Sequence, residues 1–224
     1  MITFRRVARG LKNLYRREVL RDGPLLEAKR WFRDKGDTTL RLDYPLDEDS
    51  IVVDLGGYIG QWALDIHERY GSTVHVFEPV PSLHATCVER FSGKPKLHAH
   101  RYGLSDKDGT FAITDDGDAS SFVSLEKSDS HINCELRSAP AALNALGLDH
   151  IDLLKLNIEG GEFAVLPALI EAGWLPRIRF LQIQFHTVGD YDAMRDAIRA
   201  KLAETHDEQW CYRFVWEGWE RKPG

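Results

Sequence analysis

A histidine and three polar residues stand where two neighbouring strands of a parallel sheet would end. Asn157, Glu159 and Glu162 follow one apolar run, and His186 ends the next. Ligands bind beyond the carboxyl ends of parallel strands, so these side chains should meet at one edge of the sheet. Histidine titrates near neutral pH, which makes His186 the first candidate for a general base, with Asn157 and Glu159 as further catalytic candidates. The alternative for His186 is a structural histidine.

Glu159 and Glu162 stand at the start of a predicted helix, spaced so that both can face the same way. They could position a substrate hydroxyl, the role that we assign to Glu162, or hold Mg²⁺ through oxygen ligands. The helix dipole alone also favours acids at this place. We expect no required metal, because no dense acidic cluster accompanies them. Lys155, in the preceding strand, could pair with one of these acids, or it could form a plain structural ion pair.

A glycine turn predicts a nucleoside cofactor. Asp54, Gly56, Gly57 and Gly60 form the pattern D-x-G-x-x-x-G after an apolar run, whereas the dinucleotide pattern G-x-G-x-x-G is missing. An acid before the first glycine would repel a pyrophosphate but suits a cofactor that carries an ammonium and a sulfonium. The turn therefore favours S-adenosylmethionine (SAM), with its product S-adenosylhomocysteine (SAH), over NAD. The alternative is that the glycines only make a tight turn.

Two later segments would complete the cofactor site. Glu78 and Pro79 end the next apolar run, where an acid can accept hydrogen bonds from both ribose hydroxyls. Leu104, Ser105 and Asp106 follow the third run and are expected near the adenine, although their composition also suits a simple turn.

Apolar runs that alternate with helical patterns predict an α/β fold, a mostly parallel sheet with helices on both faces. The strand-like runs are residues 51–55, 73–78, 97–102, 151–156 and 179–185. The helical patterns are residues 61–70, 82–91, 139–146, 163–172 and 191–203. Residues 110–114 and 120–125 are expected to form a hairpin over the site, and residues 209–219 a half-buried strand.

The length of 224 residues suits one domain. The net charge of −6 argues against a general nucleic-acid binder. Three scattered cysteines, no long apolar run and no signal peptide favour a cytoplasmic protein. We place the main domain at residues 50–224, behind a helical cover at 1–49. Its basic, amphipathic stretch 1–21 could pack on the domain or on a second subunit, or contact a membrane surface. A short helix over 25–33 should place Trp31 and Phe32 on the sheet.

The chain resembles the FkbM-type SAM-dependent methyltransferases in four motifs taken in order. These are Asp54-Leu-Gly-Gly-Tyr-Ile-Gly60, Phe77-Glu78-Pro79, Gly103-Leu-Ser-Asp106 and Leu153-Leu-Lys-Leu-Asn-Ile-Glu-Gly-Gly-Glu162. The resemblance implies a Rossmann-like methyltransferase sheet and methylation of hydroxyl groups on sugars, glycolipids or polyketide-type products. It also implies, by analogy, that Ser120, Ser121 and Phe122 lie near the transferred methyl group. Tyr58, expected beside the cofactor, replaces the family's frequent Asn, and Asn157 replaces its frequent Asp.

The leading interpretation is a SAM-dependent O-methyltransferase that acts on a sugar in a cell-surface glycan or a lipid-linked precursor. Tryptophans near the C-terminus could stack on sugar faces, although such residues more often belong to a core or a dimer. A tailoring enzyme for a macrolide-like product is the second interpretation. A SAM-binding assembly protein without activity is the third, and an NAD-dependent sugar-modifying enzyme is the least favoured. The expected partner is a small-molecule or glycan acceptor, with a homodimer as a further option.

Overall fold

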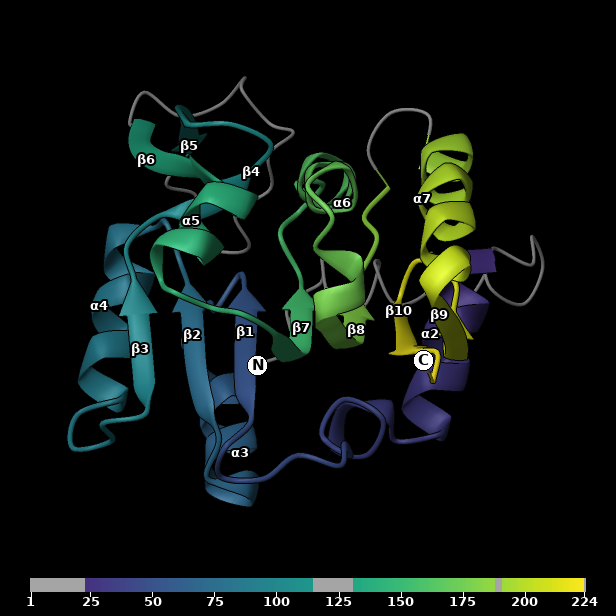
Figure 1. Cartoon of the computed structure of the whole chain (residues 1–224), viewed down its shortest axis with the longest axis horizontal. Helices are drawn as coiled ribbons and strands as arrows, with labels where there is room; N and C mark the ends of the chain where they lie inside the picture. Colours follow the sequence, from purple (N-terminus) through teal and green to yellow (C-terminus); the bar gives the residue numbers. More distant parts are fainter. Residues whose placement is uncertain (1–22, 115–130, 188–190, 224) are drawn as a thin grey trace, which may run out of the picture.

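A seven-stranded sheet forms the centre of the computed structural model, which describes residues 23–114, 131–187 and 191–223 (Figure 1). The strand order is β3-β2-β1-β7-β8-β10-β9, and all pairs are parallel except those of β10. The strands are β1 (Ile51–Leu55), β2 (Thr73–Phe77), β3 (Leu97–His100), β7 (Ile151–Leu156), β8 (Ile178–Ile183), β9 (His206–Tyr212) and β10 (Trp216–Arg221). The order reverses between β1 and β7, so a ligand crevice is expected beyond their carboxyl ends.

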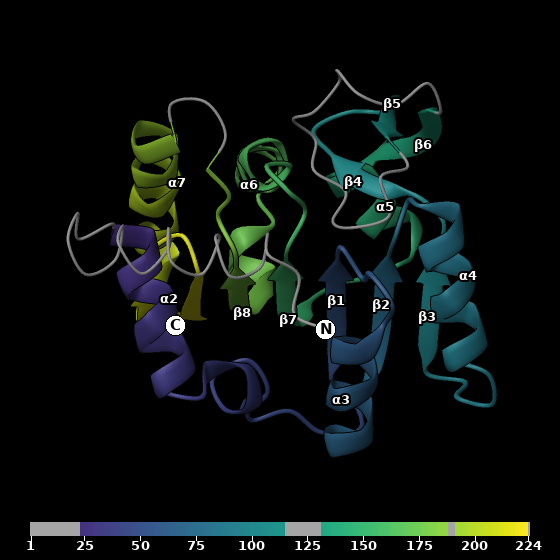
Figure 2. The ribbon, with the colours of Figure 1, turned by 180° about the vertical axis from the view of Figure 1, so that it is seen from behind.

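Helices cover both faces of this sheet. On one face, α3 (Gln61–Tyr70) and α4 (Pro81–Arg90) pack with Val52, Val74 and Leu153; they lie in front of the sheet in Figure 2. On the other face lie α5 (Ala139–Ala145), α6 (Glu162–Glu171) and α7 (Tyr191–Thr205). The predicted α/β fold is confirmed. The five predicted strands and five predicted helices of this unit agree with the observed bounds to within two residues.

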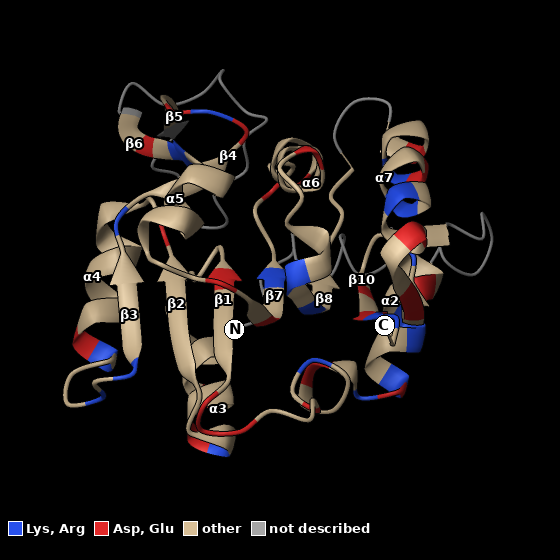
Figure 3. Ribbon diagram, viewed as in Figure 1, with Lys and Arg blue, Asp and Glu red and all other residues tan. Residues whose placement is uncertain are grey.

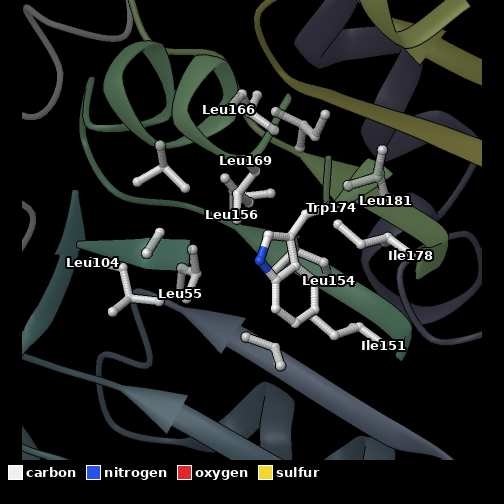
Figure 4. Packing of buried hydrophobic residues seen from close by; sticks show 14 of the residues in the cluster. Leu55, Leu104, Ile151, Leu154, Leu156, Leu166, Leu169, Trp174, Ile178 and Leu181 are labelled. Atoms are coloured by element: carbon white, nitrogen blue, oxygen red, sulfur yellow. The ribbon is translucent and has the colours of Figure 1, made fainter. Parts of the chain in front are cut away.

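Burial on both faces explains the continuous apolar runs of the central strands. In β1, Val52 faces α3, whereas Val53 and Leu55 face α6. Parallel strands covered on both sides read as apolar throughout instead of alternating. Figure 4 shows Trp174 enclosed among leucine and isoleucine side chains of β7, β8 and α6. Each large side chain buried in this way contributes roughly 1.5–3 kcal/mol through removal of its apolar surface from water.

A second, three-stranded sheet lies above the carboxyl ends of β2 and β3 in Figure 1. It contains β4 (Gly103–Ser105), β5 (Gly109–Thr114) and β6 (His131–Ser138), with β6 between the other two. The predicted strand over 110–114 is confirmed as part of β5. Residues 120–125 lie outside the described residues. Sequence reasoning predicted neither β4 nor β6. The three residues of β4 stand in a stretch of turn-like composition, whereas β6 is an eight-residue strand that sequence reasoning missed.

The prediction of a single strand over 209–219 was wrong. The segment forms a hairpin of β9 and β10, and Phe214 turns the chain with a φ of +57°. The helix expected over 25–33 is confirmed as α2 (Gly23–Arg33), which buries Trp31 against Tyr212 and Trp216. Phe32, however, is 70% exposed and does not pack on the sheet.

A short 3₁₀ turn, η1 (Gly36–Thr38), follows α2. Gly36 lies against the Trp31 ring so closely that a Cβ atom there would lie 2.3 Å from it. Residues 1–21, the expected basic helix, lie outside the described residues. Among the helices that the structure does describe, none combines the length and apolar character needed to cross a bilayer.

Candidate functional site

In the glycine turn after β1, alternate residues adopt the left-handed backbone conformation. Gly56, Tyr58 and Gly60 have φ values of +84°, +52° and +76°. A Cβ atom on Gly56 would lie 2.0 Å from the carbonyl oxygen of Asn157, so the turn contacts the end of β7 directly. Tyr58 adopts a backbone conformation that costs of order 1–2 kcal/mol for a residue other than glycine. Something must therefore hold the turn in place.

Glu78 holds it. One carboxylate oxygen accepts a hydrogen bond from the Tyr58 amide (2.8 Å), and the other accepts one from the Val80 amide (3.0 Å). Burial raises the pKa of Glu78 to about 7, against the effect of these two amides. Each carboxylate oxygen has a further lone pair, so Glu78 can still accept hydrogen bonds from a ligand.

Asp54 and Lys155 form a buried ion pair behind the turn. The Lys155 ammonium donates to Asp54 Oδ1 (2.7 Å) and to the Gly56 carbonyl (2.9 Å). In Figure 3 the acidic end of β1 lies beside the basic segment of β7. Burial raises the pKa of Asp54 and lowers that of Lys155, while their mutual attraction opposes both effects. Of the two alternatives for Lys155, the structure shows the structural ion pair, with Asp54 as the partner, and not a pair with Glu159 or Glu162.

A hollow opens beyond β1, β2 and β7. Of the residues predicted to bind the cofactor, five line it: Gly56, Glu78, Pro79, Leu104 and Ser105. Apolar side chains, among them Phe77, Val80 and Ile158, make up most of its remaining wall. A pocket that is largely apolar with a few convergent polar groups suits a nucleoside.

The other predicted cofactor residues lie around this hollow. Gly57 and Tyr58 line a second hollow that adjoins the first at Gly56. Asp54 is fully enclosed, although its Oδ2 atom has no hydrogen-bond partner among the described residues. Gly60 precedes α3, where a Cβ atom would press on the Phe91 ring at 2.8 Å. Asp106 lies outside both hollows and accepts a hydrogen bond from the Ser105 hydroxyl.

The predicted catalytic residues come together beside the first hollow. His186 Nδ1 lies 2.9 Å from Glu162 Oε1, and His186 Nε2 lies 3.5 Å from Glu159 Oε1. The His186 amide also donates to Glu162. Burial disfavours the charged imidazole ring and is the largest single influence, but the Glu162 and Glu159 carboxylates together outweigh it, so the pKa of His186 is raised. Glu162 itself is fully buried, so its carboxylate serves His186 and the Gly160 amide (2.9 Å).

Asn157 and Glu159 lie between the hollows and the cluster of His186 and Glu162. Asn157 lines both hollows, and Glu159 lines the first while its carboxylate approaches His186. Glu159 has a φ of +50°, a second strained residue at the same edge of the sheet as Tyr58. Ser120, Ser121 and Phe122 lie outside the described residues.

One group of side chains elsewhere has the spacing of metal ligands, namely Glu208, Cys211 and Glu217. Arg199 contacts both carboxylates, and Arg195 also pairs with Glu217. Because the acids already neutralise two guanidinium groups, this group is explained as an ion-pair network between α7 and the β9–β10 hairpin.

Sequence reasoning missed Arg41, which lines the second hollow. It precedes β1 by ten residues in an irregular segment and belongs to no pattern, so nothing in the sequence distinguishes it from other surface arginines. It also missed that Asp54 and Lys155 are partners, because pairing across neighbouring strands depends on their register.

Comparison with known proteins agrees with this architecture. The model of the family described as "Methyltransferase FkbM domain" matches residues 54–213. Methyltransferase 1 of Beauveria bassiana is 28% identical over 159 residues, which cover 58% of this chain and 62% of that protein. The AMB antimetabolite synthetase AmbE of Pseudomonas aeruginosa is 27% identical over 202 residues, 69% of this chain and 9% of the synthetase. The chain thus spans less than two thirds of either relative.

Among solved structures, a Clostridium thermocellum protein described as a candidate rRNA methylase has a TM-score of 0.53 at 10% identity. The similarity covers 86% of this chain and 96% of that one, and at this identity it supports the fold alone. The family model covers more than half of the sequence, including all four motifs of the site. The chain therefore belongs to the methyltransferase FkbM domain family.

Proposed function

We propose that this chain is a SAM-dependent O-methyltransferase in which His186 removes the proton of the accepting hydroxyl. One observation carries the proposal: a histidine oriented by a buried glutamate stands beside a largely apolar hollow at the switch point of the sheet. Family membership supports methyl transfer, and the histidine supports oxygen as the acceptor atom, since a hydroxyl attacks poorly while it holds its proton.

The residues present fit the cofactor. The first hollow has apolar walls for an adenine and a Glu78 carboxylate for the ribose hydroxyls. Behind the turn, the Asp54 Oδ2 atom is buried and has no hydrogen-bond partner within the described residues, so it can still accept a hydrogen bond. When bound, SAM would supply an electrophilic methyl group on its sulfonium, and the sulfur would leave as a neutral thioether. Positioning and exclusion of water can then provide much of the rate.

His186 has two distinct nitrogens. With Nδ1 donating to Glu162, Nε2 keeps a free lone pair on the side of Glu159. Nε2 accepts the proton of the hydroxyl, and the Glu162 carboxylate stabilises the imidazolium ion that results. Glu159, whose carboxylate is partly exposed, is placed to accept a second hydrogen bond from the acceptor. Asn157, between the two hollows, offers an amide to orient the attacking oxygen.

For the acceptor we propose a sugar hydroxyl, as the family resemblance implies. The C-terminal tryptophans do not support this choice, because Trp216 and Trp219 are buried and Trp210 packs on Trp31. A second acceptor class is the hydroxylated precursor of a natural product. The similarity to part of an antimetabolite synthetase favours it.

The test is methyl transfer by purified wild-type protein and by the His186→Ala variant, with nucleotide sugars, oligosaccharides and hydroxylated polyketides as acceptors. The histidine variant should bind SAH as the wild type does and lose roughly 10²- to 10⁴-fold in kcat. His150→Ala is the matched control, because His150 also stands near a carboxylate, that of Asp152, but on the surface. Turnover of His186→Ala at the wild-type rate would remove His186 as the base. Each reaction is repeated in EDTA, which should leave the rate unchanged.

A further inference from the structure

A second hollow of about 350 Å³ adjoins the first one where the glycine turn begins. Gly56 and Asn157 line both hollows, so the two lie next to each other at this point. One wall of the second hollow is the turn and the start of α3, from Gly56 to Trp62. Another part of the lining comes from Asp37, Arg41 and Leu42, which precede the part of the chain that the family model matches.

Arg41 is the cation of that part of the lining, and three contacts fix its position. Its guanidinium lies 4.3 Å from the centre of the Trp216 ring and donates to Asp37 (3.1 Å). The Gln182 amide, in the orientation that satisfies both of its polar atoms, accepts from Arg41 Nε (3.1 Å). The side chain keeps 19% of its surface exposed. Arg41 is therefore held in one conformation before any ligand arrives, which lowers the entropic cost of binding.

The segment is also tied to the turn. The Trp62 indole donates a hydrogen bond to the Arg41 carbonyl oxygen (3.0 Å), which links residues 37–42 to the first turn of α3. Within the described part of the chain, α3 has no side-chain cap at Gly60 and no acidic residue in its first turn. A negative group placed there gains from the helix dipole and from the free backbone amides.

The charges around the hollow are mixed. Arg41 and Lys155 are positive, and Asp37 and Asp65 are negative. Lys155 is buried and already bound to Asp54 and to the Gly56 carbonyl. Arg41 is paired with Asp37 through one guanidinium nitrogen, and the fork of a guanidinium group offers further N–H donors to a ligand carboxylate. A hollow with both signs of charge suits a zwitterion, and an amino-acid group is the zwitterionic end of SAM.

We propose that Arg41 binds the carboxylate of the methionine half of the cofactor, and that Asp37 lies on the side of its ammonium group. The segment before β1 thereby becomes part of the cofactor site. This inference rests on the proposed function, since it assumes a ligand with adenosine at one end and an amino acid at the other.

Calorimetry with two ligands tests it without any turnover. SAH carries the amino-acid group, whereas 5′-methylthioadenosine keeps the adenosine and lacks that group. In Arg41→Gln the affinity for SAH should fall roughly 10- to 100-fold, as expected for loss of a charge-assisted pair, while the affinity for 5′-methylthioadenosine stays within about threefold. Arg41→Lys, which keeps the charge, should lose less of the SAH affinity. Arg69→Gln, a change at an arginine on the surface beside Asp43, should alter neither affinity.

The outcomes separate this inference from the proposed function. Equal losses for both ligands in Arg41→Gln would show that Arg41 supports the fold only, and thermal unfolding without ligand would reveal the same destabilisation. Unchanged SAH affinity would place the carboxylate elsewhere. Either result overturns the role of Arg41 and leaves the SAM assignment intact. A wild-type protein that binds neither ligand would overturn both.

Discussion

Replacement of Glu162 by glutamine tests the centre of the proposed mechanism. The two side chains have nearly the same shape, but the carboxylate accepts hydrogen bonds on both oxygens, from His186 through Oε1 and from the Gly160 amide through Oε2. The new amide has one acceptor and one donor end. In either orientation its NH₂ group faces a backbone or ring N–H, so one buried donor is left without a partner. We expect a loss of about 1–3 kcal/mol in the free energy of unfolding.

Activity should fall by more than this stability loss explains. Without a carboxylate on Nδ1, the imidazolium ion that forms during proton removal is no longer stabilised, and the ring loses its fixed tautomer. Such a change is expected to lower kcat by roughly 10²- to 10⁴-fold, with KM for SAM little changed. Glu159→Gln is the matched control, because its carboxylate is partly exposed and lies 3.5 Å from His186. It should lose much less.

The pH dependence gives a readout that a purely structural role would not move. His186 must be neutral to act as a base, so wild-type kcat should rise with pH through a pKa above the usual 6.5 of histidine. In Glu162→Gln burial is the main remaining influence and lowers the pKa of His186, so this limb should shift to lower pH. The raised pKa of His186 stabilises the folded wild-type protein below pH 6.5, and this contribution is lost as the pH rises through the pKa of His186 in the folded state. The Glu162→Gln variant lacks this contribution, so its loss in the free energy of unfolding should be largest at low pH.

The assay is kcat and KM against pH, together with urea unfolding at about pH 6 and pH 9. A Glu162→Gln enzyme with the wild-type kcat and an unmoved pH profile would refute the orienting role. Loss of activity in strict proportion to the unfolded fraction would refute it as well, since Glu162 would then only stabilise the fold.

Two further predictions follow from the turn after β1. Gly56→Ala should cost more than about 3 kcal/mol and abolish SAH binding, because the new methyl group would overlap the Asn157 carbonyl. Gly147→Ala, at a similar φ in open space, should cost only about 1 kcal/mol in urea unfolding, and equal costs would contradict this reasoning. Glu78, with a pKa of about 7, should bind ribose hydroxyls best when ionised, so SAH affinity should weaken below pH 7 and binding should release protons. Calorimetry in buffers of different ionisation enthalpy measures that release, and a Glu78→Gln variant with the same pH dependence would count against it.

The sequence predicted the central sheet well because the signal is local. The apolar runs of β1 and β7, with their flanking glycines, specify buried strands wherever they lie. The meeting of His186 with Glu159 and Glu162 was also predictable, since both segments follow neighbouring parallel strands. The contacts that the sequence analysis missed depend on the register between strands and on packing between residues far apart in the sequence. No local pattern shows that Lys155 lies opposite Asp54, or that Arg41 stacks on Trp216 from the far end of the chain.

The C-terminal aromatic residues illustrate the same limit. Their alternation with polar residues correctly indicated extended chain, but the reversal at Phe214 has no glycine or proline to mark it. Trp210 and Trp31 pack together although most of the chain separates them. Trp210 and Trp216, two of the C-terminal tryptophans that suggested sugar binding, therefore pack with Trp31 in one hydrophobic cluster.

Two buried glutamates relate the stability of this site to its chemistry. Glu78 accepts a hydrogen bond from Tyr58 and holds the turn after β1, while Glu162 accepts one from Gly160 and holds the turn after β7. Each of these turns contains a residue other than glycine with positive φ, Tyr58 or Glu159, and would relax without its carboxylate. The same carboxylates face the first hollow, in the case of Glu78, or His186, in the case of Glu162. Tyr58 and Asn157 take part in this framework through backbone atoms, the Tyr58 amide and the Asn157 carbonyl, so the contacts that shape the two turns do not depend on the side chain at either position.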